Sequence, residues 1–202
     1  MNSIVRTQDD KVQEIIKCGK DAVYFIDKYV KIQHPKKGLI PCKLYPFQVD
    51  CLRAFEEHRF NIVVKARQLG LSTITAAYVL WLALFHKDKN ILVIATKLTT
   101  AINFIKKVKV ALAALPQWLI LTSSSSTFQS VKFANRSTIT AIPTSEDAGR
   151  SEAISLLICD ECVSFPTLTT VRNKKTGEIK TLEVGKLYTY LYEQQLRKVT
   201  KV

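Results

Sequence analysis

The sequence predicts an α/β fold in which helices cover a parallel β-sheet. Three observations support this: apolar β-branched runs alternate with helical patterns, a glycine-containing turn joins the first such run to a long apolar helix, and two carboxylates follow the last run. This alternation is typical of parallel strands connected by helices. With 202 residues, 47% of them hydrophobic, the chain is long enough for one domain with a substantial core and a smaller additional part.

The part of the chain before the glycine-containing turn is expected to be mainly helical. Apolar residues recur at three-to-four spacing over residues 9–31, with Gly19 as a break. Residues 34–38 indicate a loop because they contain a proline and a glycine. Residues 47–57 form an amphipathic pattern that predicts a short helix, and the β-branched run 60–65 predicts the first strand.

Strands and helices continue to alternate after the turn. We expect a helix at 72–85, a second buried strand at 89–96 and a helix over about 99–114. The serine run 123–126 indicates a connecting loop. The remaining expected elements are a hairpin of 128–133 and 137–142 that turns at Asn135-Arg136, and a core strand at 154–159.

Composition restricts the classes of function. A net charge of +13 and a pI near 9.6 favour a polyanionic partner, either nucleic acid or nucleotide. The longest apolar run, 74–85, is too short to span a bilayer, and the N-terminus lacks the apolar core of a signal peptide. The five cysteines show no secreted disulfide framework, so we expect a reducing cytosol. The spacing of Cys159 and Cys162 matches a C-x-x-C pair, but the acidic residues between them disfavour thiolates, and no second pair completes a zinc site.

Residues 65–72, Lys-Ala-Arg-Gln-Leu-Gly-Leu-Ser, occupy the position of a phosphate-binding P-loop between a strand and a helix. Gly70 and Ser72 match the P-loop pattern, whereas Lys65 and Leu71 stand where a glycine and the usual lysine are expected. The site needs a cation near the β- and γ-phosphates, and Lys65 or Arg67 can supply it. A plain strand-to-helix turn is the alternative interpretation of the same residues.

Asp160 and Glu161 follow the apolar strand 154–159. In a nucleotide-hydrolysing site, Ser72 is expected to ligate Mg²⁺, with Thr73 as the substitute, and Asp160 to hold the ion through its water shell. Glu161 is expected to orient and deprotonate the attacking water. An acidic turn at the end of a strand is the alternative. We therefore predict ATP and Mg²⁺ as cofactors of a P-loop NTPase-type sheet.

Four segments in order, residues 24–30, 32–35, 44–48 and 65–73, resemble the ATPase domain of the large terminase subunit of tailed phages. The similarity covers about residues 15–161. It implies that the phosphate loop carries its cations early, at Lys65 and Arg67, which accounts for Leu71. The matched motif also includes Gln68.

The resemblance implies roles for two further residues. Gln48 would contact adenine, and Arg150 matches an arginine that in some family members acts as a finger on a neighbouring subunit's nucleotide. Ser151 follows Arg150 where the family usually has glycine, so a solvated arginine stays as the alternative. The family continues past the acidic pair with a coupling motif, further strands and a nuclease domain, so we expect the ATPase sheet within residues 1–161 to be incomplete.

Residues 162–202 resemble the opening block of an intein. Cys162 is followed by an aliphatic residue and, five positions on, by Thr167, and residues 173–178 predict a hairpin turn between two β-rich runs. The resemblance implies a small all-β Hint fragment in which the thiol of Cys162 attacks the carbonyl carbon of Glu161. The later Thr-x-x-His and His-Asn blocks of inteins are missing here, which implies a split intein whose other half is a separate polypeptide. A divergent terminase tail with an ordinary buried cysteine is the alternative.

The leading hypothesis from the sequence is therefore a split precursor: residues 1–161 as the N-terminal half of a DNA-packaging ATPase, and 162–202 as an N-intein that trans-splices with a C-intein/C-extein chain. The isolated chain is expected to be inactive. The spliced motor would work on double-stranded DNA with the portal and the small terminase subunit, as a homo-oligomer in the cytoplasm of the infected bacterial host, with no membrane partner. Two alternatives stay open: a free-standing P-loop ATPase or helicase-like domain, and a non-catalytic basic DNA-binding module.

Overall fold

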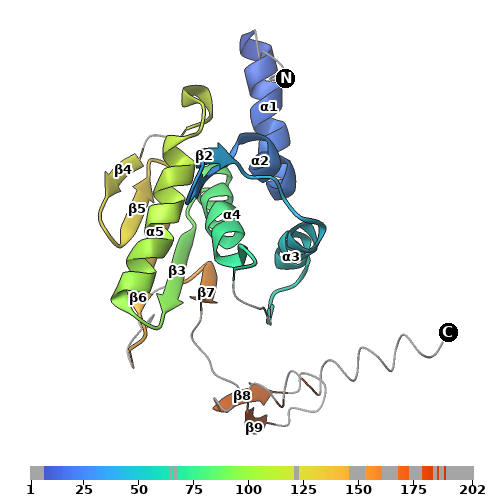
Figure 1. Ribbon diagram of the computed structural model, residues 1–202, viewed down its shortest axis with the longest axis vertical. Coiled ribbons are helices and arrows are strands. Elements are labelled where there is room, and N and C mark those ends of the chain that lie inside the picture. Colours follow the sequence, from blue (N-terminus) through green and yellow to red (C-terminus); the bar gives the residue numbers. More distant parts are fainter. Residues whose placement is uncertain are drawn as a thin grey trace, which may run out of the picture. The chain divides into compact units, whose positions relative to one another are not determined.

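The computed structural model describes residues 7–63, 65, 68–120, 123–145, 153–160, 168–172, 179–183, 186 and 189. The chain divides into two compact units, Met1–Asp160 and Glu161–Val202. The first unit contains a five-stranded sheet and five α-helices among its described residues, and the second contains a two-stranded sheet (Figure 1).

The N-terminal helical region is a pair of helices, α1 (Gln8–Lys20) and α2 (Ala22–Tyr29). A break between two helices is present, but it lies at Asp21 and not at the predicted Gly19, which is inside α1. The Asp21 carboxylate accepts a hydrogen bond from the Tyr24 N–H at 3.0 Å and so caps α2. Gly19 allows α1 to approach α4, because a Cβ at this position would lie 3.3 Å from Cδ1 of Phe85.

A short hairpin follows, formed by β1 (Lys31–His34) and β2 (Gly38–Pro41), which pair antiparallel. The predicted loop at 34–38 is the turn of this hairpin. The two strands were not predicted, because each has only four residues and the polar turn dominates the sequence pattern. The predicted helix at 47–57 is confirmed as α3 (Pro46–Glu57), with proline in its first turn.

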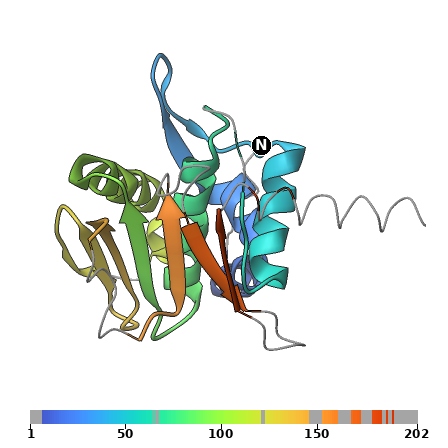
Figure 2. The same cartoon turned by 90° about the horizontal axis from the view of Figure 1, so that it is seen from below.

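The central sheet has the strand order β4-β5-β6-β3-β7. Its parallel part consists of β6 (Thr138–Pro143), β3 (Asn90–Ala95) and β7 (Leu156–Asp160), with β3 in the middle. Figure 2 shows β7 (orange) beside β3 (green). In register, Ala95 pairs with Asp160, so the carboxyl end of β3 lies beside the acidic end of β7.

The sheet is mixed rather than purely parallel, which corrects the prediction. β5 (Ser130–Phe133) pairs antiparallel with β6 as the predicted hairpin, and β4 (Ser123–Ser126) pairs antiparallel with β5. The prediction of a loop at Ser123–Ser126 is therefore wrong. Serine has little preference for strands, and backbone pairing with β5 outweighs this local tendency.

Two helices pack against the sheet and supply much of the core, α4 (Leu71–Phe85) and α5 (Leu98–Ala113). They contact each other, and both contact β6. The helix-facing side chains of β3, Ile91 and Val93, are fully buried. Ten of the fifteen residues of α4 are buried, so this helix is the centre of the first unit. A short 3-10 helix, η1 (Gln117–Leu119), follows α5.

The predicted strand at 60–65 is absent from the described part of that segment, Phe60–Val63 and Lys65. Its apolar side chains are exposed: Phe60 by 74%, Ile62 by 53% and Val63 by 43%. Among the described strands, β7 pairs only with β3 and so forms one edge of the sheet. A β-prone run becomes a strand only when a neighbour supplies hydrogen bonds, and here no described strand does so.

The second unit contains β8 (Leu168–Arg172) and β9 (Ile179–Glu183), which pair antiparallel from Leu168 opposite Glu183 to Arg172 opposite Ile179. This pairing confirms the predicted hairpin, whose turn residues lie outside the described part of the chain. Among the helices that the structure describes, none is both long enough and apolar enough to cross a bilayer.

Candidate nucleotide-binding site

The candidate site lies where the first turn of α4 meets the carboxyl end of β7. The Ser72 hydroxyl donates a hydrogen bond to Oδ1 of Asp160, with 3.0 Å between the oxygens. These residues are 88 positions apart in sequence. The fold thus brings together the two oxygen-bearing side chains that the sequence assigned to a metal ion.

Gly70 shapes the loop that leads into α4. Its φ of 72° lies in the left-handed region, where glycine carries no Cβ penalty. The N–H groups of Thr73 and Ile74 both donate to the Gly70 carbonyl at 3.0 Å, which closes the first turn of the helix. As the N-cap, Gly70 has no side chain to accept from the first N–H groups. A helix start of this kind presents N–H groups and a positive dipole end to an anion.

Gln48 on α3 braces this loop. Its side chain is only 5% exposed; Oε1 accepts from the Tyr45 N–H at 3.1 Å and Nε2 donates to the Leu69 carbonyl at 2.9 Å. A Cβ on Gly70 would lie 3.0 Å from Nε2, so glycine is also needed here for space. The amide therefore joins α3 to the phosphate loop, and one Nε2 hydrogen remains for a further acceptor.

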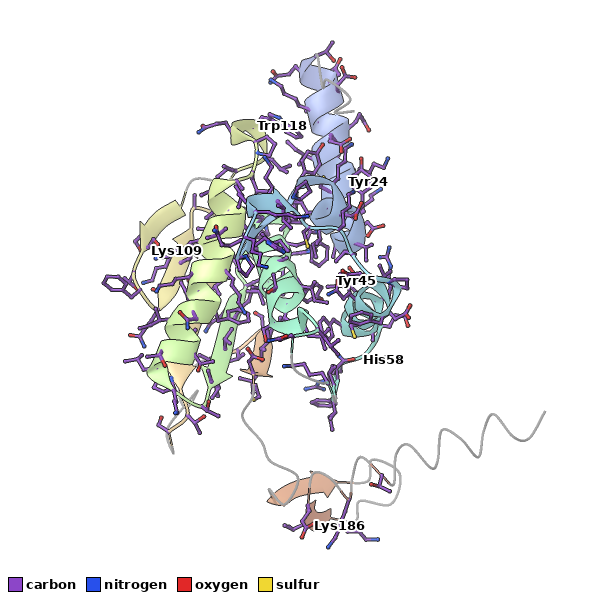
Figure 3. All side chains as sticks on the ribbon, viewed as in Figure 1. Tyr24, Tyr45, His58, Lys109, Trp118 and Lys186 are labelled. Carbon is purple, nitrogen blue, oxygen red and sulfur yellow. The ribbon has the colours of Figure 1, made fainter. Side chains whose placement is uncertain are left out.

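Two aromatic side chains that the sequence analysis did not assign flank Gln48. Tyr45 and Phe47 stack with 5.8 Å between ring centroids and 6° between planes, and they are 63% and 39% exposed. Figure 3 labels Tyr45 near the start of α3. The sequence signal was available: two aromatic residues surround the proline that begins an amphipathic helix. An exposed aromatic pair beside the loop offers a flat apolar surface suited to a planar base.

The remaining loop residues have different environments. Leu71, at the usual lysine position, is only 8% exposed and packs in the core, which explains why a charged residue is absent there. Gln68 is exposed with a left-handed φ of 64°, and Lys65 and Thr73 are half-buried. Four predicted site residues lie outside the described part of the chain: Arg67, Arg150, Glu161 and Cys162.

The other candidate metal ligands do not assemble into a site within the described residues. These contain no group of three or more His, Cys, Asp or Glu side chains that could hold an ion. Burial raises the pKa of the Cys18 thiol to about 12 and of the Cys42 thiol to about 11, so both are neutral thiols at physiological pH. Cys159 is exposed.

The donor set at Ser72 and Asp160 fits Mg²⁺. A hydroxyl and a carboxylate are hard oxygen ligands, and Mg²⁺ in phosphate-handling sites usually takes one or two protein ligands and keeps several waters. Their 3.0 Å contact places both oxygens at one point beside the helix start that suits phosphate.

Comparison with known proteins identifies the fold and the family of the chain. The crystal structure of the HK97 bacteriophage large terminase is similar to this chain, with a TM-score of 0.53 and 16% sequence identity over 71% of this chain. The match spans 37% of the length of that protein, so this chain corresponds to part of it. Residues 62–176, more than half of the chain, match the model of a terminase family, and the match continues past Cys162. The chain therefore belongs to the family of terminase large subunits, T4likevirus-type, N-terminal.

Proposed function

We propose that residues 1–161 bind Mg²⁺-ATP and form the N-terminal part of the ATP-hydrolysing motor that packages phage DNA. The observation that carries this proposal is the hydrogen bond from Ser72 to Asp160, next to a helix start that has no side-chain cap. Family membership adds support, because large terminase subunits are generally ATPases.

The proposed roles follow from the positions of the residues. The first N–H groups of α4 and the cations of Lys65 and Arg67 would bind the phosphates, and Ser72 and Asp160 would hold Mg²⁺. When bound, the ion neutralises charge on the β- and γ-phosphates. Glu161, directly after Asp160 in sequence, would accept a proton from the attacking water.

Three further residues would bind the nucleotide but take no part in its hydrolysis. Gln48 holds the loop through Leu69 and has one amide hydrogen left for the adenine, while Gln68 and Thr73 lie next to the phosphate-binding residues. Arg150 would act on the nucleotide of a neighbouring subunit in a homo-oligomeric motor. Such a motor would work on double-stranded DNA with a portal and a small terminase subunit in the cytoplasm of the infected host.

The test of the nucleotide site compares cation variants with a packing variant in the assembled motor. Lys65→Ala or Arg67→Ala should lower the rate of ATP hydrolysis on the order of 100-fold, because each removes charge that stabilises the transition state. Leu71→Ala is the matched control. It should reduce thermal stability, since Leu71 is buried, but change the rate far less. Wild-type hydrolysis in both cation variants would refute the assignment of residues 65–73.

As a second candidate function, we propose that residues 162–202 are the N-terminal part of a split intein. Two observations favour it: the compact units divide between Asp160 and Glu161, and the β8–β9 hairpin forms where intein resemblance predicts strands. The family match that extends to residue 176 favours the competing hypothesis that β8 continues the terminase chain.

The chemistry of the first splicing step is an N-to-S acyl shift. The Cys162 sulfur would attack the carbonyl carbon of Glu161, the peptide C–N bond would break, and a thioester would form while the released amine takes up the thiol proton. Donors for the tetrahedral oxyanion and the acid for the leaving amine would come from the C-intein chain.

Mixing the chain with a C-intein/C-extein polypeptide tests this second function. Mass spectrometry should show loss of residues 162–202 and a new peptide bond after Glu161. Cys162→Ala should abolish the product, whereas Cys159→Ala should leave it unchanged. A ligated product from the Cys162→Ala chain would refute the intein hypothesis. We further expect negligible ATP hydrolysis before splicing and DNA-stimulated hydrolysis afterwards, and robust turnover by the unspliced chain would contradict this latency.

A further inference from the structure

Helix α1 leaves an apolar strip uncovered on one side. Val12, Ile15 and Ile16 are 47%, 37% and 45% exposed, whereas Cys18 on another side of the same helix is fully buried. Figure 1 shows α1 reaching beyond α2 toward the N-terminus. The three aliphatic side chains are three and four residues apart, so they are neighbours on the helix surface. A contiguous exposed apolar strip of this kind indicates an interaction surface.

The exposed end of α1 is held as a helix by bonds within the chain. The Thr7 hydroxyl oxygen accepts from the Asp10 N–H at 3.1 Å, and the Asp10 carboxylate accepts from the Thr7 N–H at 3.0 Å. Farther along, Glu14 accepts from the Tyr24 hydroxyl at 2.7 Å, and Nζ of Lys17 lies 4.4 Å from the centre of the Tyr24 ring. The apolar strip is therefore presented on an ordered helix, which lowers the entropy cost of binding.

Two charged side chains lie on the same side of α1 as the strip. Asp9, Val12, Ile16 and Lys20 are separated by three, four and four residues, which places them along one side of the helix, and all four are exposed. Among the residues that the structure describes, no ion pair engages Asp9 or Lys20. This face therefore has a negative end, an apolar middle and a positive end.

We propose that this face, formed by Asp9, Val12, Ile16 and Lys20, binds a second copy of the chain, with the two α1 helices antiparallel. The acidic end of each copy then meets the basic end of the other, and the apolar middles cover each other. The spacing suits one two-fold axis, because positions 9 and 20 have their midpoint between 14 and 15 and positions 12 and 16 have theirs at 14. A parallel pair would instead place like charges together, which is unfavourable.

The pair would be small and distinct from a ring. Residues 9–20 span about 17 Å of helix, so the contact is smaller than a standard interface of about 800 Å² per partner. We therefore expect weak association, with a Kd on the order of 100 µM. A two-fold pair closes on itself, whereas a ring needs head-to-tail contacts, so this pairing goes beyond the oligomeric motor proposed above and does not depend on nucleotide.

Sedimentation equilibrium of the 202-residue chain at low salt measures the pairing over a range of protein concentrations. The wild type should form dimers as the concentration rises. Ile16→Asp should weaken dimerisation about tenfold or more, because it places a charge in the apolar contact. Leu39→Asp is the matched control: Leu39 is 47% exposed but lies on β2, so this variant should dimerise like the wild type. A monomeric wild type, or equal losses in both variants, would overturn the proposal.

Charge reversal tests the antiparallel arrangement. Asp9→Lys and Lys20→Asp should each weaken dimerisation about tenfold, because each replaces two attractive pairs by two repulsive ones. A mixture of the two variants, or a chain carrying both substitutions, has opposite charges facing each other again and should dimerise nearly as well as the wild type. Both substitutions also oppose the dipole of α1, so a loss caused by helix fraying would be largest in the double variant. Failure of the mixture and the double variant to recover would overturn the pairing.

Discussion

The two ends of α4 are built in opposite ways. At its carboxyl end, side chains from distant parts of the chain satisfy the terminal carbonyls: Nδ2 of Asn135 donates to the Ala83 carbonyl at 2.8 Å, and the Ser137 hydroxyl donates to the His86 carbonyl at 2.7 Å. At its amino end, Gly70 supplies no side-chain cap. Each end of a helix leaves four backbone groups without partners inside the helix, so the two ends of α4 differ in what satisfies these groups.

At the carboxyl end of α4, polar side chains of the protein itself cap the helix. At the amino end, the N–H groups are left without a side-chain cap and are available to a ligand. Ser137 is fully buried and makes its bonds within the protein. Ser72, in the first turn, instead contacts a carboxylate with the correct chemistry for Mg²⁺. Substitutions at the amino end of α4 should therefore change ligand affinity, and substitutions at its carboxyl end should change the stability of the fold.

The largest effect is expected at the amino end. Ser72→Ala and Asp160→Asn should each lower Mg²⁺-dependent ATP affinity by about 100-fold, because the first removes a ligand oxygen and the second removes the negative charge that holds the hydrated ion. Titration of a fluorescent ATP analogue with and without Mg²⁺ checks this. Thr99→Ala, an exposed hydroxyl on α5, serves as the control. Unchanged affinity in both site variants would show that the ion is held elsewhere.

Gly70→Ala should lower both the stability of the fold and the affinity for ATP. The left-handed φ of 72° costs an alanine about 1–2 kcal/mol, and its Cβ would lie 3.0 Å from Nε2 of Gln48. Thermal unfolding should show a lower Tm, and ATP affinity should fall about tenfold as the loop shifts.

Gly38→Ala is the matched control for that prediction. Its φ of 69° imposes similar strain, but nothing lies within 4 Å of the added Cβ, and the residue belongs to the β1–β2 hairpin. It should lower stability by a similar amount and leave ATP affinity intact. If both variants lose affinity alike, the contact between Gln48 and the loop has no special role.

Ser137→Ala at the carboxyl end should reduce stability by about 2 kcal/mol, because it removes the donor to the His86 carbonyl and the acceptor for the Lys89 N–H. ATP affinity should not change. Urea unfolding monitored by tryptophan fluorescence measures the difference. Ser125→Ala, at an exposed position, should change stability by less than about 0.5 kcal/mol. Lost affinity in Ser137→Ala would mean that the two ends are coupled.

The smallest effect concerns Glu14, which joins α1 to α2. Burial raises the pKa of its carboxyl, but hydrogen bonds from Lys28, Tyr24 and Tyr29 outweigh burial and lower it to about 2. A lowered carboxyl pKa stabilises the fold above the unfolded value near 4.5, and this contribution disappears as the pH falls toward 2.

Glu14→Gln should therefore cost about 1 kcal/mol at pH 7 and less at pH 3. Urea unfolding at the two pH values gives the comparison, with Glu57→Gln at an exposed position as the control. A cost that does not shrink at pH 3 would show that the ionised carboxylate is not the stabilising form.

Sequence reasoning predicted the elements whose local pattern agrees with their tertiary role. α4, β3, α5 and the β8–β9 hairpin have strong apolar periodicity or turn signals, and the structure confirms them. The sequence-based prediction failed where backbone pairing between strands outweighs local preference. β4 is a run of serines that forms a strand because it pairs with β5. Residues 60–65 have strand propensity, but no described strand pairs with them. Pairing is a property of the whole sheet and cannot be read from a short window.

The candidate site shows the same division. Gly70, Ser72 and Asp160 could be selected from motif chemistry, because phosphate and Mg²⁺ need those residue types. The bracing role of Gln48 could not, since its contact with the Leu69 carbonyl depends on how α3 packs against the loop. The two aromatic residues around Pro46 were a sequence signal, but the parallel stacking of Tyr45 on Phe47 depends on the backbone at the start of α3.

The separation of 88 residues between Ser72 and Asp160 also has a kinetic consequence. Closing a long segment costs chain entropy before any contact repays it, and proteins rich in such distant pairings fold slowly. The contact between Ser72 and Asp160 requires β7 to pair with β3, and β3 in turn pairs with β6. During refolding, Mg²⁺-dependent nucleotide binding should therefore appear later than α4. The rate at which binding appears would report the rate of the last folding step.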